Sequence, residues 1–222
     1  MKKQILALLL SFSVIVGFVA CERSSNSSPE NSVPRAEQPP MPPGPPPGNY
    51  EPVALAVSSD LIEEIMRAYS NTRYKASPVS DNVLEAILQS GQKAPSAANA
   101  QPWHFTVIKN NELARQISPR HYNEGAVVII ISGRTDTRFD TAFDCALAAQ
   151  NIFLAAHSLG LGARMYYGGV QDVNDNRKAS LSIPDNFKAQ IILLVGYPED
   201  DVDAVTSASP RRPLLENVNY FE

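Results

Sequence analysis

The run APSAANAQPWHF at residues 94–105 constrains the fold of this chain more than any other segment. It follows an amphipathic pattern at 81–93, which predicts a helix, and leads into an apolar pattern at 104–108, which predicts a strand. Pro95 and Pro102 fix φ and remove backbone donors within this helix-to-strand connection. The connection is therefore expected to be a stiff turn whose remaining polar groups face outward.

Polar side chains give the same turn the composition of a binding site. Ser96, Asn99 and Gln101 offer hydrogen-bond donors and acceptors from a rigid backbone. Such a frame suits a flat heterocycle whose edge alternates N–H and C=O groups. The alternative interpretation is a proline-rich turn that binds no ligand.

The N-terminus has the pattern of an export signal. Lys2 and Lys3 precede an apolar run at 5–19 that is short for a membrane span. The small residues directly before Cys21 resemble the cleavage box of bacterial lipoproteins, so residues 1–20 are predicted to be a lipoprotein signal peptide. Cys21 would then carry lipid and anchor an extracytoplasmic protein to a membrane. The alternative is a cytosolic protein with an apolar N-terminus.

The next segment, residues 21–57, has the composition of a tether. Its Ser-, Asn- and Glu-rich sequence passes into PPMPPGPPPG and offers little apolar surface to bury, so it is expected to be disordered or polyproline II. A proline-rich ligand for a partner domain is the functional alternative. Residues 58–222 remain for the globular part, and about 165 residues are enough for one core and one domain.

Cysteine usage and charge exclude several functions. The chain has 2 cysteines, so Cys145 is alone once Cys21 carries lipid, and its alanine-rich surroundings indicate a packing role. The formal net charge is −4 and no basic stripe is present, which argues against a nucleic-acid partner. Neither a Ser-His-Asp arrangement nor a His/Cys cluster with metal-ligand spacing is evident, so no metal is expected.

Hydrophobic periodicity predicts the remaining elements of the globular part. Ser80 is expected to cap the helix at 81–93. The longest periodic segment, 139–159, is followed by Gly160 and Gly162 as stop signals. This segment is apolar nearly all round, which predicts a helix buried on several sides, as in a dimer core. The other predicted elements are a helix at 58–69 and strands at 126–132, 163–167 and 189–196.

Several segments, in order, carry a family resemblance. The chain resembles the nitroreductase family of FMN-dependent oxidoreductases in these segments: TRYKASPVSDNVLEAIL, APSAANAQPWHF, DCALAAQNIFLAAHSLGLGARMYYGG, AQIILLVGYPED and RRPLLENVNYFE. The resemblance covers about residues 58–222. It implies an α+β, nitroreductase-like fold, in which helices flank a central, mostly antiparallel sheet and a long helix forms the dimer core. It also implies a homodimer that holds FMN at the subunit interface, with the C-terminal arm at 213–221 reaching across.

The resemblance assigns cofactor-binding roles to particular residues. By this resemblance the flavin ring and ribityl chain contact Pro95, Ser96, Asn99 and Gln101. The backbone at Gly168 and Gly169 approaches the flavin N5, and the phosphate is bound near Ser70, Arg211 and Arg212. No side chain is required as a general acid or base, because the flavin carries the chemistry.

The chain departs from the family pattern at the phosphate. Ala68 and Thr72 stand where the family has basic residues, although Arg67 and Arg73 lie next to them and are expected to substitute in part. Hydrogen bonds to charged groups contribute roughly 1.5–3 kcal/mol each, so two missing partners weaken FMN binding by about 3–6 kcal/mol. An exported protein that loses its flavin to dilution needs another means of retaining it.

The segment DAVTSAS at 203–209 suggests that means. It resembles the acceptor motif of exported flavoproteins, in which a flavin transferase joins FMN through its phosphate to the final hydroxyl. Here that hydroxyl belongs to Ser209, although Ser207 replaces the commoner glycine and Ser209 the commoner threonine. Ser209 is therefore the candidate for covalent FMN. The alternative is an ordinary polar loop.

Three functional hypotheses follow from the sequence. The first is an oxidoreductase that passes electrons from reduced FMN to a small electrophilic acceptor, of the nitroaromatic or quinone type. The second is a covalently flavinylated module that relays electrons from a membrane redox partner without a dedicated substrate. The short connection at 117–139 favours this second hypothesis, because family members usually have more residues in this connection, and those residues cover the flavin. The third is a structural lipoprotein that has lost the flavin.

Overall fold

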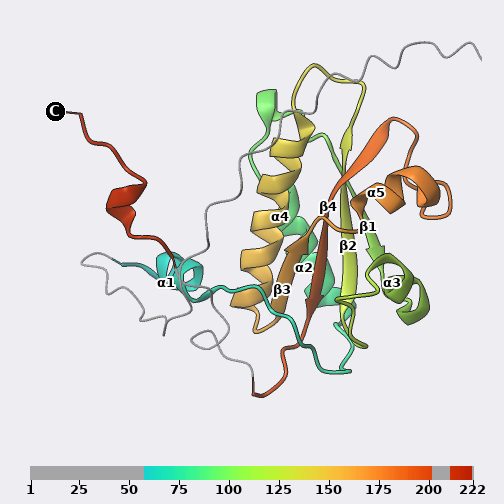
Figure 1. Ribbon diagram of the computed structural model, residues 1–222, viewed down its shortest axis with the longest axis horizontal. Helices are drawn as coiled ribbons and strands as arrows, with labels where there is room; N and C mark the ends of the chain where they lie inside the picture. Colours follow the sequence, from blue (N-terminus) through green and yellow to red (C-terminus); the bar gives the residue numbers. More distant parts are fainter. Residues whose placement is uncertain (1–57, 202–210, 222) are drawn as a thin grey trace, which may run out of the picture. The chain divides into compact units, whose positions relative to one another are not determined.

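The computed structural model describes residues 58–201 and 211–221 of the chain. Its centre is a four-stranded sheet in the order β1-β2-β4-β3, and every neighbouring pair is antiparallel (Figure 1). The strands are β1 (Trp103–Ile108), β2 (Val127–Arg134), β3 (Gly162–Tyr166) and β4 (Phe187–Gly196). A β-bulge interrupts the β2–β4 register between Ile131 and Ser132.

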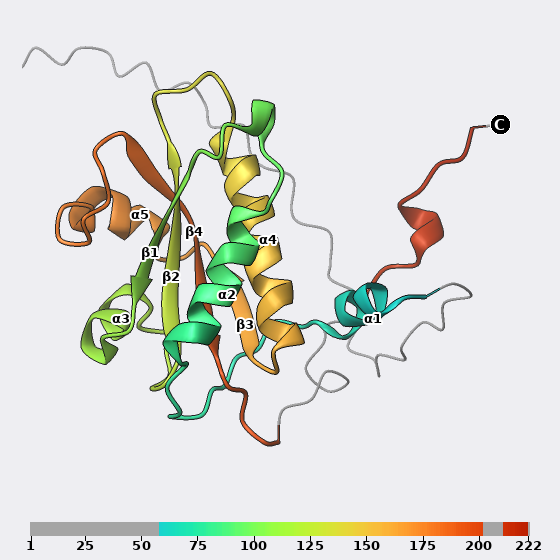
Figure 2. The same ribbon diagram turned by 180° about the vertical axis from the view of Figure 1, so that it is seen from behind.

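Helices cover both faces of this sheet. Figures 1 and 2 show α2 and α4 on one face, and α3 and α5 on the other. The predicted α+β class with a central antiparallel sheet is confirmed. The helices are α1 (Asp60–Arg67), α2 (Asp81–Gln92), α3 (Asn111–Ile117), α4 (Thr141–Ser158) and α5 (Val170–Asp172), with a π-helical turn at Val173–Arg177 and 3₁₀ turns at Ala97–Asn99 and Leu214–Glu216.

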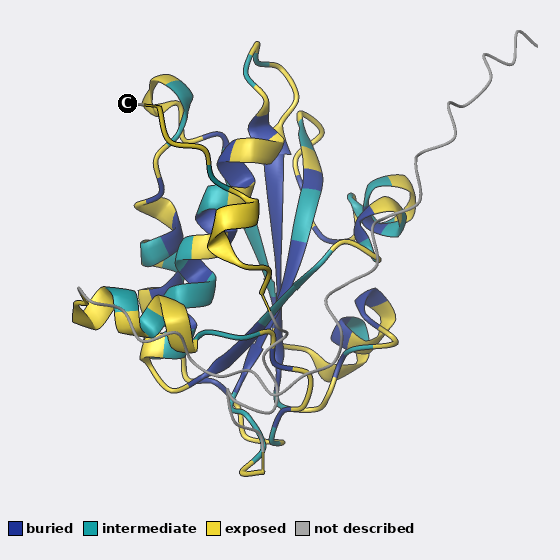
Figure 3. Cartoon of the chain, turned by 60° about the vertical axis from the view of Figure 1, so that its left-hand side comes forward, coloured by how far each residue is buried: buried dark blue, intermediate teal, exposed yellow. Residues whose placement is uncertain are grey.

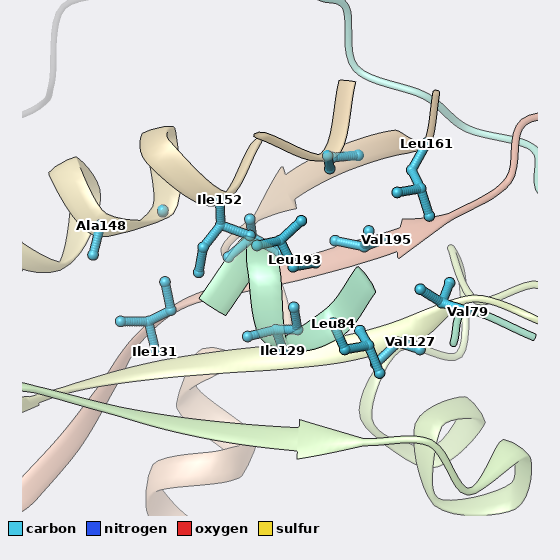
Figure 4. Close-up of a cluster of buried hydrophobic side chains, with 14 of the residues drawn as sticks. Val79, Leu84, Val127, Ile129, Ile131, Ala148, Ile152, Leu161, Leu193 and Val195 are labelled. Carbon is cyan, nitrogen blue, oxygen red and sulfur yellow. The ribbon is translucent and has the colours of Figure 1, made fainter. Parts of the chain in front are cut away.

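Strand β2 supplies the centre of the core. Its side chains alternate between faces, so Val127, Ile129 and Ile131 join the cluster beneath α2 and α4 (Figure 4). Val128 and Ile130 join the cluster beneath α3 and α5. Because both faces are covered, β2 is an unbroken apolar run, and each fully buried side chain of this kind contributes about 1.5–3 kcal/mol.

Helix α4 ends at a glycine in the left-handed conformation. Gly160 has φ 75°, a left-handed value that glycine adopts at little cost. Its amide donates to His157 O at 3.0 Å, and the Leu161 amide donates to Ala156 O at 2.9 Å, which together form a Schellman motif. Gly160 is thus the predicted stop signal. Gly162 has a different role, because a Cβ there would overlap the Asn71 side chain.

The structure corrects the sequence prediction at several boundaries. Strand β2 runs on to Arg134 and β4 begins at Phe187, so both are longer than predicted. Helix α3 and the α5 turn had no predicted counterpart. Ser80 occupies the N-cap of α2 as expected, but its side chain makes no capping hydrogen bond.

Several large apolar side chains of the described residues are exposed. Helix α1 buries none of its residues, and Leu61 is 64% exposed. Figure 3 shows that the buried residues are concentrated on the strands of the sheet. Phe143 of α4 and Phe221 of the C-terminal arm are also exposed. Within the described residues, no helix is both long and apolar enough to cross a membrane. The predicted signal peptide and tether lie outside the described residues.

Candidate functional site

The connection between α2 and β1 has a strained backbone. Ala98, Asn99 and Gln101 have φ values of 52°, 51° and 45°. A left-handed conformation costs a non-glycine residue roughly 1–2 kcal/mol. Such a cluster of strained residues persists only where its surroundings hold it, and clusters of this kind gather at ligand-binding sites.

Hydrogen bonds from inside and outside the loop hold this conformation. The Gln101 amide donates to Ser96 Oγ at 3.0 Å, and Gln101 Nε2 donates to Asn99 Oδ1 at 3.3 Å. The Ala97 amide donates to Asp144 Oδ1 at 3.2 Å, which ties the loop to α4. Asn99 and Gln101 remain exposed, as predicted.

Asp144 is a residue that the sequence prediction missed. It is 2% exposed, and its Oδ2 has no hydrogen-bond partner among the described residues. Burying a carboxylate costs free energy unless hydrogen bonds compensate for the lost water. Here Asp144 Oδ1 accepts the hydrogen bond of the Ala97 amide and so ties the loop to α4. An acidic residue on the apolar face of the predicted helix was the available signal.

The segment that carries Ser70 lies along the free edge of β3. Ser70 forms a parallel bridge with Ala163, and the Asn71 amide donates to Ala163 O at 3.0 Å. Asn71 is fully buried, and its Nδ2 donates to Arg73 O at 2.9 Å. These contacts fix the backbone on either side of Ser70, whose own side chain stays exposed.

Ser70 and Arg211 meet at one cavity of about 420 Å³. They are separated by most of the domain in sequence, so the fold has brought two predicted phosphate contacts together. Arg212 is exposed and is not among the residues that line the cavity. The apolar part of the lining includes Ile65, Met66, Phe153, Leu154 and Met165.

The two neighbouring arginines are engaged elsewhere. Arg67 pairs with Glu63 at 3.0 Å and with Glu64 at 3.4 Å, and Arg73 pairs with Asp201 at 2.8 Å. Neither arginine lines the cavity. Exposed ion pairs are worth only about 0–1 kcal/mol, so their energy does not prevent a phosphate from competing for the arginines. Both side chains would nevertheless have to move to reach the cavity. The structure therefore gives no support to their expected role as substitutes.

The predicted glycine pair borders a second cavity, of about 420 Å³. A Cβ at Gly169 would lie 2.7 Å from Ile117 O, so packing requires glycine there. A Cβ at Gly168 would meet nothing within 4 Å. The space beside Gly168 would allow a ligand to approach its backbone closely.

The predicted site residues thus fall in three places within one protomer. Ser70 and Arg211 share the first cavity, and Gly168 and Gly169 share the second. Pro95, Ser96, Asn99 and Gln101 belong to the strained loop and line neither cavity. Among the described residues, no group of three or more His, Cys, Asp or Glu side chains could hold a metal ion.

Cys145 and His157 have packing roles, and for Cys145 the sequence indicates this role. Cys145 is fully buried, and burial, reinforced by the nearby Asp144 carboxylate, raises the pKa of its thiol to about 12. His157 Nε2 lies 2.9 Å from Tyr69 O, and its ring packs edge-on against Phe153. Burial lowers the pKa of His157, so this imidazole is a neutral packing group near pH 7.

Comparisons with known proteins identify relatives of this chain. The chain matches the nitroreductase family over residues 65–125 and 120–197. A protein of Methanothermobacter thermautotrophicus, named for NADH dehydrogenase or NAD(P)H nitroreductase activity, is 32% identical over 168 residues, covering 71% of this chain and 87% of the relative. The NADPH-flavin oxidoreductase of Vibrio harveyi is 26% identical over 184 residues, covering 74% and 76%.

A solved structure shares the fold at similar coverage. The structure of a Desulfovibrio desulfuricans nitroreductase in complex with FMN has a TM-score of 0.64 and 26% identity, covering 75% of this chain and 99% of that one. The chain belongs to the nitroreductase family. It is an oxidoreductase of that family, with the nitroreductase-like fold that the sequence predicts.

Proposed function

We propose that this protein binds FMN and passes electrons from the reduced flavin to a small electrophilic acceptor outside the cytoplasm. The observation that carries the proposal is the cavity shared by Ser70 and Arg211. FMN-bound and flavin-dependent relatives support the same cofactor. No particular acceptor follows from the family.

The residues of the first cavity fit the two ends of FMN. The Arg211 guanidinium and the Ser70 hydroxyl are donors of the kind that bind a phosphate. Phe153 and Met165 supply apolar wall for the less polar part of the cofactor. When bound, FMN supplies hydride and electron transfer, and the protein contributes binding and orientation.

A second copy of the chain is the proposed source of the missing contacts. Nitroreductase-family members are generally dimeric. The strained loop at 94–105 lines neither cavity of its own protomer, and exposed apolar faces remain on α1, at Leu61 and Ile65, and at Phe143 of α4. Dimerisation would bury these faces and let the loop of one protomer complete the flavin site of the other.

Changing Arg211 to alanine is expected to weaken FMN binding by about 10- to 100-fold, because a hydrogen bond to a charged group is worth roughly 1.5–3 kcal/mol. Riboflavin lacks the phosphate, so its affinity is expected to stay the same. Quenching of flavin fluorescence on titration measures both dissociation constants, using protein produced without a flavin transferase.

The matched control for this titration is Lys109→Ala. Lys109 is an exposed cation paired with Asp81 and lies away from the first cavity. Its replacement is expected to leave both affinities unchanged. Equal loss of FMN and riboflavin affinity in Arg211→Ala would show that Arg211 does not bind the phosphate, and no quenching by either flavin in the wild type would refute the proposed function.

Membrane anchoring is a further part of the proposal. It is supported by the sequence pattern at 1–20 and by Cys21, both outside the described residues. Radiolabelled palmitate is expected to be incorporated into the wild type and not into Cys21→Ser, because the serine hydroxyl cannot replace the thiol that receives the lipid. Label retained in Cys21→Ser would contradict the anchor.

We propose in addition that FMN is joined through its phosphate to Ser209: a flavin transferase would move FMN from an activated donor such as FAD, so that the Ser209 hydroxyl loses its proton and bonds the FMN phosphorus while the phosphoanhydride bond to AMP breaks and AMP leaves. This residue and the motif at 203–209 lie outside the described residues. Support comes from the segment around Ser70: Ala68 and Thr72 replace the family's basic residues, and Arg67 and Arg73 are paired with carboxylates. A covalent bond would retain the cofactor that this weakened phosphate site releases.

A further inference from the structure

Strand β4 runs past the end of β3. The two strands pair from Tyr166 opposite Ile192 to Gly162 opposite Gly196. Residues 187–191 of β4 therefore have no β3 residue beside them, and their backbone groups that face away from β2 need other partners. The chain leaves β3 here and passes through the glycine pair, Gly168 and Gly169, into α5, on the face of the sheet that α3 also covers (Figures 1 and 2).

The side chain of Asn174 supplies such partners at Ala189. Its Nδ2 donates to Ala189 O at 3.0 Å, and the Ala189 amide donates to Asn174 Oδ1 at 2.8 Å. A side-chain amide carries the same donor and acceptor as a peptide group, so Asn174 takes the place that a residue of β3 would have. Ala189 is 1% exposed, and without Asn174 both of its backbone groups would lose these buried hydrogen bonds.

Two uncommon backbone features meet at this contact. The register with β2 shifts beside Ala189, where Gln190 is the extra residue of β4. Asn174 lies in the π-helical turn Val173–Arg177, a rare conformation that is frequently found at functional sites. β-Bulges are likewise over-represented next to active sites. Their meeting at one pair of hydrogen bonds indicates a role for Asn174 beyond packing.

The contact also closes a short loop on β4. The last β3–β4 pair joins Tyr166 to Ile192, and the Asn174 contact joins the chain to Ala189. Ile192 and Ala189 are about 10 Å apart along the strand, at about 3.4 Å per residue. The segment 167–173, which contains the glycine pair, is therefore held to one strand at both of its ends.

Hydrogen bonds inside this loop connect Asn174 to the glycine pair. The Val173 amide, directly before Asn174, donates to Gly169 O at 3.1 Å, and the Val170 amide donates to Tyr167 O at 3.0 Å. Val170 and Val173 are buried in the cluster beneath α3 and α5. Loss of the Asn174 contact would free the end of the loop that bonds to Gly169, while the end at β3 stays attached.

We propose that Asn174 is a positioning residue for the flavin ring: its side-chain amide holds segment 167–173 on β4 and so fixes the backbone of Gly168 and Gly169 at the second cavity. The proposal rests on the proposed function, because the family resemblance assigns the flavin ring to this backbone. Asn174 is not among the residues that line the second cavity, so it acts through the backbone.

The first measurement needs no flavin. In Asn174→Ala, the amides of segment 167–173 are expected to exchange hydrogen at least about 10-fold faster than in the wild type, because two hydrogen bonds that close the loop are lost. Asn174→Asp keeps the shape and the acceptor but loses the donor to Ala189 O, so it is expected to change exchange in the same direction. Mass spectrometry of the full-length chain, produced without a flavin transferase, measures the exchange.

The second measurement is flavin affinity, from the quenching of flavin fluorescence. FMN and riboflavin carry the same ring, so Asn174→Ala is expected to weaken both by about 3- to 10-fold, the effect of one weakened neutral hydrogen bond. Arg211→Ala, by contrast, is expected to weaken FMN alone. The midpoint potential of bound FMN is expected to shift in Asn174→Ala and to stay unchanged in Arg211→Ala, because only the first variant moves the backbone beside the ring.

The matched control is Asn110→Ala. Asn110 Oδ1 accepts a hydrogen bond from the Leu113 amide at 2.9 Å, and Asn110 lines neither the first nor the second cavity. Its replacement also removes a side chain-to-backbone bond, but it is expected to change neither exchange at 167–173 nor flavin affinity.

Two results would overturn the proposal. The first is wild-type exchange at 167–173 in both Asn174 variants, and the second is faster exchange with unaltered flavin affinity and midpoint potential. A wild type that binds neither flavin would instead refute the proposed function, whereas faster exchange in its Asn174 variants would still support Asn174 as the anchor of this loop.

Discussion

Changing Ser209 to alanine is expected to abolish the retention of flavin through denaturation, when the exported chain is produced together with a flavin transferase. A phosphoester at this position needs a side-chain hydroxyl, and alanine has none. The effect is therefore all or none, unlike the graded loss expected for Arg211→Ala. Flavin fluorescence of the denatured protein in a gel, together with its intact mass, measures the attachment.

Two further variants make this test specific. Ser207→Ala changes the same motif without removing the proposed acceptor, so it is expected to keep the flavin. Ser209→Thr restores a hydroxyl at the acceptor position and is expected to keep the flavin as well. A wild-type chain that loses its flavin on denaturation, or a Ser209→Ala chain that retains it, would contradict covalent attachment.

The sequence was most informative where local pattern and burial coincide. The unbroken apolar run of β2 marks a strand buried on both faces, and Gly160 ends α4 by local geometry alone. The family segments then placed Ser70 and Arg211 in one site, and the fold brings both to one cavity. Periodicity could not have joined them, because nothing local connects residues so distant in the chain.

The contacts that the sequence did not predict depend on tertiary structure. Helix α3 is a short element whose Ala114 and Ile117 are buried by packing, so its local signal was weak. The pairing of Arg73 with Asp201 joins segments far apart in the chain.

Changing Gly125 to alanine is expected to destabilise the domain by about 3 kcal/mol or more and to weaken FMN binding. Gly125 has φ +91°, which costs a non-glycine residue roughly 1–2 kcal/mol. A Cβ there would overlap Lys75 O and lie 2.8 Å from Ala76 C, and forcing atoms into a packed site typically costs about 1–3 kcal/mol more. Chemical denaturation measures the free energy of unfolding.

The flavin effect follows from the chain that Gly125 touches. Lys75 is held by its amide, which donates to Tyr197 O at 2.8 Å, and it directly follows the segment that places Ser70 beside β3. Gly160→Ala is the matched control, because Gly160 also has a positive φ but a Cβ there would meet nothing within 4 Å. Its expected cost is therefore the conformational term alone, about 1 kcal/mol, with FMN affinity unchanged. Equal destabilisation by the two substitutions would show that the backbone at Lys75 yields freely, and that the Ser70 segment is not held in place by this contact.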